Sequence, residues 1–115
     1  MRLASWHQAR RMLGLEPFWQ LTLGRYVLMG VVSSLVALPI FEPDTLKEER
    51  SEWEGLRDEH MGTINKAFTA LGSDQRVLLF CHDPTALPFL QEQPEVRAKL
   101  SQVEQTVMRC VWIRA

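Results

Sequence analysis

Apolar residues recur at helical spacing near the start of the chain. Leu3, Trp6, Ala9 and Leu13 lie three or four positions apart, and Gly14 follows them as a stop signal. This spacing predicts a short amphipathic helix over residues 3–13.

A longer helix is predicted over residues 45–71. Thr45 with Glu48 three positions later forms a capping box for its first turn, and Gly72 terminates it. Many acidic residues lie on the opposite side, as expected for a solvated surface. A further helix is predicted to begin at Pro94. The expected buried stripe of the long helix consists of Leu46, Trp53, Leu56, His60, Ile64, Ala67, Phe68 and Leu71.

Strands are predicted where apolar residues alternate or run continuously. Residues 18–41 contain an alternating stretch and then two apolar runs around Ser33-Ser34, which is typical of strands joined by a turn. Gly30 within such a strand indicates a bulge or a close backbone approach. Residues 77–80 predict a strand buried on both faces, and residues 106–113 predict a last strand. Alternating helices and strands predict an α/β fold in which helices flank the sheet.

The nearly uncharged stretch from Val27 to Phe41 also raises the alternative of a membrane span. It is shorter than the roughly 20 residues needed to cross a bilayer, and it contains Gly30 and Pro39. A membrane-associated protein is therefore the less favoured interpretation.

Composition narrows the class of protein. The chain has 115 residues, of which 46% are hydrophobic and 23% charged, as in globular domains rather than disordered ones. The net charge of -1 and the lack of a basic stripe disfavour nucleic-acid binding. Cys81 and Cys110 have no metal-type spacing, and no secretory signal is recognisable, so a cytoplasmic location with reduced thiols is expected.

The strongest candidate for chemistry follows the strand at residues 77–80. His82 comes directly after this strand, and open α/β sheets place their ligand sites at the carboxyl ends of strands. Asp83 precedes Pro84, and the commonest role of an aspartate at such a position is to start a turn. His7 is expected to be a surface or edge histidine, and His60 a packed or edge-solvated histidine rather than a second metal ligand. A cysteine enzyme built on Cys81 and His82 is disfavoured, because adjacent strand residues point to opposite faces.

The order of a hydrophobic strand, His82-Asp83-Pro84, a short loop and an amphipathic helix resembles the His-x-Pro segment of the calcineurin-like metallophosphoesterases. In that family a histidine at the end of a strand ligates one ion of a two-metal centre. The resemblance implies that His82 is a ligand of Mn, Fe or Zn and that the substrate is a phosphoester. It also implies that Asp83, besides starting a turn, could orient a ligand or a neighbouring water. It spans roughly residues 15–108, and its specific part is residues 76–90.

The other motifs of the family are absent from the sequence. No Asp-x-His, Gly-Asp, Gly-Asn-His or closing Gly-His-x-His segment occurs. We therefore expect one partial domain over residues 1–115, an α/β, metallophosphoesterase-like sandwich with strands flanked by helices. A truncated or frameshifted gene would account for the missing motifs.

Two functions follow as expectations. The first is a partial metallophosphoesterase that is inactive as an isolated chain, because one ligand cannot hold a divalent ion with useful affinity. The alternative is a non-enzymatic interaction module that pairs or self-associates through exposed sheet edges.

Overall fold

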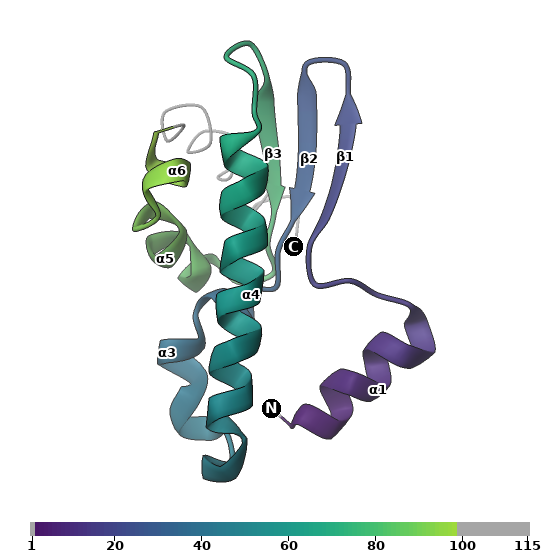
Figure 1. Cartoon of the computed structure of the whole chain (residues 1–115), viewed down its shortest axis with the longest axis vertical. Helices are drawn as coiled ribbons and strands as arrows, with labels where there is room; N and C mark the ends of the chain where they lie inside the picture. Colours follow the sequence, from purple (N-terminus) through teal and green to yellow (C-terminus); the bar gives the residue numbers. More distant parts are fainter. Residues whose placement is uncertain (1, 99–115) are drawn as a thin grey trace.

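The computed structural model describes residues 2–98, which form a mixed α/β fold with a three-stranded sheet. Figure 1 shows one long helix, α4, lying along the sheet, with α1 beyond the sheet's lower end. The residues expected to form the last strand, 106–113, lie outside the described part. The elements in order are α1 (Leu3–Leu13), β1 (Trp19–Leu23), β2 (Tyr26–Gly30), α2 (Ser33–Val36), α3 (Leu38–Phe41), η1 (Glu42–Asp44), η2 (Lys47–Glu49), α4 (Arg50–Thr69), β3 (Arg76–Phe80), η3 (Pro84–Ala86), α5 (Leu87–Gln91) and α6 (Pro94–Arg97).

The sheet has the strand order β1-β2-β3, with β1 antiparallel to β2 and β2 parallel to β3. Gly24 and Arg25 alone separate β1 from β2. Gly24 has a φ of 62° and Arg25 does not have a positive φ, which fits a type II′ hairpin turn. The parallel pairing of β2 with β3 requires a crossover, and α2, α3 and α4 supply it.

Helix α4 covers one face of this sheet. Ile64 and Phe68 are fully buried in the same core as alternate residues of β2 and β3. The strand residues that they share this core with are Val27, Met29, Val77 and Leu79. Strand β3 is therefore present where it was expected, but its burial alternates. The prediction that it is buried on both faces was wrong, because Leu78 and Phe80 on the opposite face are only half-buried.

The face of the sheet away from α4 is apolar, and much of it is exposed. The register places Trp19 opposite Gly30, Leu21 opposite Leu28 and Leu23 opposite Tyr26. Trp19, Leu21, Leu23 and Tyr26 keep between 41% and 54% of their surface exposed. Across Gly30, the ring of Trp19 packs on Phe80 with its centroid 5.6 Å away. The close approach predicted at Gly30 is confirmed: a Cβ there would collide with the Trp19 indole.

Residues 35–40 are helical, so the expectation of a strand here was wrong. The N–H of Val36 donates to the carbonyl of Val32 at 3.0 Å and that of Ala37 to Ser33 at 2.8 Å. Pro39 lies at the start of α3, where a missing N–H costs nothing. A short apolar run is buried equally well as a strand or as a helix between layers, which is why hydrophobicity alone misassigned it. Among residues 2–98, no helix is both long and apolar enough to cross a membrane.

The two predicted amphipathic helices are present. Helix α1 ends at Gly14, whose φ of 62° makes the expected left-handed stop. The capping box predicted for α4 is not formed. Thr45 instead donates its hydroxyl to the carbonyl of Glu42 at 2.6 Å, and the turn η2 separates it from the first residue of α4, Arg50.

Candidate functional site

The carboxyl ends of the parallel strands β2 and β3 meet at one edge of the sheet. The N–H of Val31 donates to the carbonyl of Phe80 at 3.1 Å, which extends the ladder past both strands. Just beyond, the N–H of Asp83 donates to the hydroxyl of the buried Ser33 at 2.9 Å. The turn after β2 and the turn after β3 are therefore tied together, and this edge is where α/β sheets place ligand sites.

His82 lies at this edge, in the bend between β3 and η3, and it is exposed. The preceding residue, Cys81, is buried with 6% of its surface accessible. The two side chains thus lie in different environments, as expected for neighbours at a strand end. Solvent exposure leaves the His82 imidazole accessible to a ligand from outside the described residues.

Asp83 performs the role of a turn residue. Its Oδ1 accepts a hydrogen bond from the N–H of Thr85 at 3.0 Å, which caps the first turn of η3, and Pro84 begins that turn. The side chain is half-buried. Of the two roles considered for Asp83, starting the turn is confirmed, and the orientation of a metal ligand stays a prediction.

A complete metal site is not formed by residues 2–98. Within that range, no group of three or more His, Cys, Asp or Glu side chains is placed to hold one ion. Divalent ions of the expected kind need four to six positions filled, so ligands other than His82 would have to come from outside these residues. These residues do not fit a complete two-metal centre.

Beneath the same edge, His60 of α4 is buried, with 3% of its surface exposed. Its Nε2 accepts a hydrogen bond at 3.0 Å from the N–H of Val32, the residue that precedes α2. A backbone N–H can only donate, so the proton of the neutral imidazole is on Nδ1. Within residues 2–98 this Nδ1 has no hydrogen-bond partner.

Burial lowers the pKa of His60 to about 4, because the interior disfavours the charged imidazolium. His60 is therefore neutral near pH 7 and available as an acceptor. Of the packed and edge-solvated positions expected for His60, the packed one is confirmed. The hydrogen bond to Val32 could not be predicted, since it joins residues 28 positions apart. By this bond α4 fixes the turn that carries Ser33.

A cleft of about 140 Å³ opens beside His60 between α1, the segment before β1, α2 and α4. Its polar wall includes Arg10 and Glu16, which form an ion pair at 3.1 Å, and Glu59. Trp6 and Phe18 supply aromatic surface. The cleft therefore combines one cation with two carboxylates.

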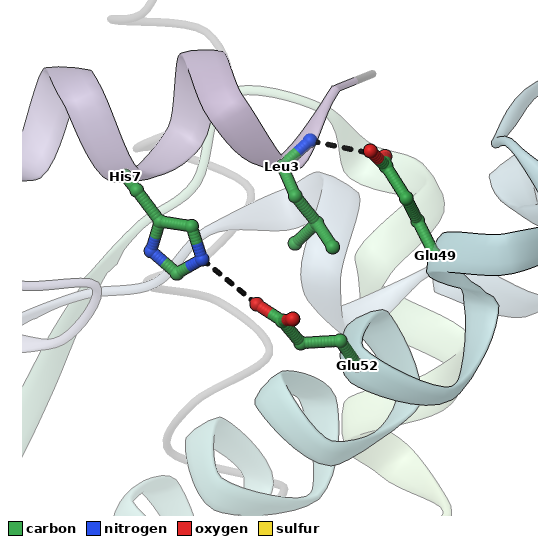
Figure 2. Close-up of polar contacts among 4 residues, drawn as sticks. All are labelled: Leu3, His7, Glu49 and Glu52. Atoms are coloured by element: carbon green, nitrogen blue, oxygen red, sulfur yellow. Dashed lines mark hydrogen bonds and ion pairs between the residues drawn. The ribbon is translucent and has the colours of Figure 1, made fainter.

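Helix α1 is fastened to the start of α4 by two polar contacts, drawn in Figure 2. Nε2 of His7 lies 2.8 Å from a carboxylate oxygen of Glu52, and the N–H of Leu3 donates to Glu49 at 3.1 Å. His7 is thus a partly exposed histidine at the edge of a helix contact, as expected. Neither contact belongs to the strand edge that carries His82.

Comparison with known proteins found no family model, no curated protein and no solved structure that matches this chain.

Proposed function

We propose that this chain is part of a metallophosphoesterase-like domain in which His82 supplies one imidazole ligand to a metal centre. The observation that carries the proposal is the position of His82: exposed, at the carboxyl end of β3, and beside the carboxyl end of the parallel strand β2. The proposed ions are Mn, Fe or Zn, of which imidazole suits Fe and Zn best, and the proposed substrate class is a phosphoester.

The uncovered face of the sheet supports this proposal. In a sandwich of two sheets, each sheet packs one face against its partner about 10 Å away. Here α4 occupies one face, and Leu21, Leu28 and Leu78 form a row across the other. A second sheet, absent from residues 2–98, would bury that row.

In a complete centre of this kind, two metal ions would supply the electrostatic activation of the phosphoester. In this chain, His82 would hold one position of one ion. The hydrogen bond from Asp83 to Ser33 would keep that position at a fixed place on the sheet edge. Because the remaining ligands are missing from the described residues, the isolated chain should not hydrolyse phosphoesters.

The test is a calorimetric titration of Mn²⁺ into the purified chain, with hydrolysis of an activated phosphodiester measured in the same samples. We expect weak Mn²⁺ uptake that His82→Ala removes, and no turnover. His7→Ala is the matched control, because it deletes another partly exposed imidazole far from the strand edge. Uptake that His82→Ala leaves unchanged would overturn the role of His82. Turnover that depends on His82 would show that the ligand set is complete after all.

A second candidate function is a non-enzymatic module that binds another polypeptide at a sheet edge. The observation that favours it is β1, all five residues of which are exposed. Its test uses an uncharged alternating peptide such as Thr-Val-Thr-Val-Thr, added to ¹⁵N-labelled protein. Shifts of the Gln20 and Thr22 amide signals support the module, and unchanged signals contradict it.

A further inference from the structure

Strand β1 is an edge strand with one row of backbone groups facing outward. It pairs only with β2 among the strands of residues 2–98, and in Figure 1 no labelled element lies along its other side. In a two-residue hairpin, Leu23 and Tyr26 beside the turn exchange both backbone hydrogen bonds. Because this pattern alternates, the N–H and C=O groups of Gln20 and Thr22 point away from the sheet.

Strand β1 lacks the features by which natural edge strands avoid pairing with other chains. In soluble proteins these features are lysine, proline, a bulge or an inward-pointing charge. The sequence of β1 is Trp-Gln-Leu-Thr-Leu, with no charge and no proline, and its pairing with β2 is continuous. An unguarded edge of this kind is a template for pairing with a further strand.

The pattern of β1 is symmetric about Leu21. Apolar residues occupy positions 19, 21 and 23 on one face, and polar residues occupy positions 20 and 22 on the other. If two copies pair antiparallel about a two-fold axis at Leu21, Trp19 of each copy faces Leu23 of the other. The axis brings the two Leu21 side chains together, and Gln20 faces Thr22. Every apolar side chain then meets an apolar one.

We infer that β1 pairs with β1 of a second copy of this chain, joining two three-stranded sheets into one. This inference rests on the second candidate function above and names the partner. Gln20 of one copy and Thr22 of the other then form a hydrogen-bonded pair, in which the backbone N–H of each donates to the backbone C=O of the other. These two residues form the pairs because they carry the outward-facing backbone groups of β1. The apolar faces of the two sheets become continuous across the joint.

The charges at the two ends of β1 fit this arrangement. Antiparallel pairing centred on Leu21 places the turn residue Arg25 of one copy at the end where Glu16 of the other copy precedes its strand. Both side chains are exposed. The net charge of -1 adds little repulsion between copies. Opposite charges therefore lie near each other at the ends of the paired strands, and apolar side chains face each other along them.

The test is sedimentation equilibrium of the whole chain at concentrations up to about 500 µM, a range that also detects weak interfaces. We expect a monomer–dimer equilibrium. Leu21→Lys places two ammonium groups at the axis and should raise the dissociation constant at least about tenfold. Leu21→Glu should do the same. An equimolar mixture of the two variants should recover dimers, since opposite charges then meet.

Ile40→Lys is the matched control, because it removes an apolar side chain of similar exposure, 53% against 51%, on α3. It should leave the dissociation constant unchanged. Circular dichroism of each variant checks that it is folded. A mixture that stays monomeric, or an Ile40→Lys variant that dissociates as Leu21→Lys does, overturns the inference.

A monomeric wild-type protein also overturns the inference, and the peptide titration then separates two cases. If Thr-Val-Thr-Val-Thr shifts the Gln20 and Thr22 amide signals, the edge binds foreign strands and only the second copy is refuted. If the signals do not move, the interaction module is refuted as well.

Discussion

Acidification should destabilise this fold through His60. The folded state holds this imidazole neutral with a pKa of about 4, whereas in the unfolded chain it titrates near pH 6.5. Between about pH 6.5 and pH 4, His60 is therefore mostly protonated in the unfolded state and mostly neutral in the folded state. Stability contributed by neutral His60 is fully present above about pH 6.5, falls as the pH is lowered, and is lost by about pH 4.

The magnitude follows from the difference between the two pKa values. About 2.5 pKa units at 1.36 kcal/mol per unit amount to about 3 kcal/mol. A domain of this size has only about 5–15 kcal/mol of stability in total, so the loss is measurable. Protonation also places a hydrogen on Nε2, which can then no longer accept from the N–H of Val32.

Urea unfolding followed by circular dichroism at pH values between 7.5 and 4 measures this loss. The control is His60→Gln, which keeps a side-chain acceptor on α4 but cannot be protonated in this range. All other titrating groups are common to both proteins, so the difference between the two stability curves isolates His60. We expect the wild type to lose about 3 kcal/mol more than the variant between pH 6.5 and 4. Parallel curves would refute the buried, neutral state of His60.

Three further substitutions test local features by urea unfolding. Gly30→Ala should destabilise the fold by about 1 kcal/mol, since the new Cβ displaces the Trp19 indole from its packing; an unchanged midpoint would contradict that contact. Gly55→Ala should stabilise it by about 1 kcal/mol, because the position is exposed within α4 and nothing lies within 4 Å of the added methyl. Asp83→Ala should cost about 1 kcal/mol by removing the acceptor for the Thr85 N–H, and Asp83→Asn should retain most of that stability; equal losses in the two variants would argue against the cap.

The elements that the sequence predicted correctly are those with a long or strongly bounded pattern. Helix α1 with its stop at Gly14, most of helix α4 and strand β3 belong to this group. The close approach at Gly30 was also predictable, since a glycine inside a strand commonly marks a bulge or a place where another group comes near the backbone. In each case, the deciding interactions lie near in sequence or follow from a repeated spacing.

What could not be predicted depends on which elements meet in space. Residues 35–38 are buried, and an apolar run that is buried suits a helix as well as a strand. The Thr45 hydroxyl could have accepted from the N–H of Glu48 in a capping box, but it donates to the carbonyl of Glu42 instead. The place of His82 at a strand end followed from the pattern, but the contact of Asp83 with Ser33 joins residues 50 positions apart.

The role of His82 as a metal ligand is tested most directly by paramagnetic NMR. Mn²⁺ broadens the signals of nuclei close to it even when binding is weak, so a titration maps where the ion spends its time. We expect broadening centred on His82 and the neighbouring residues 31–33, abolished by His82→Ala and unaffected by His7→Ala. Broadening confined to the acidic surface of α4, or broadening near residue 82 that survives His82→Ala, would contradict the proposed metal site.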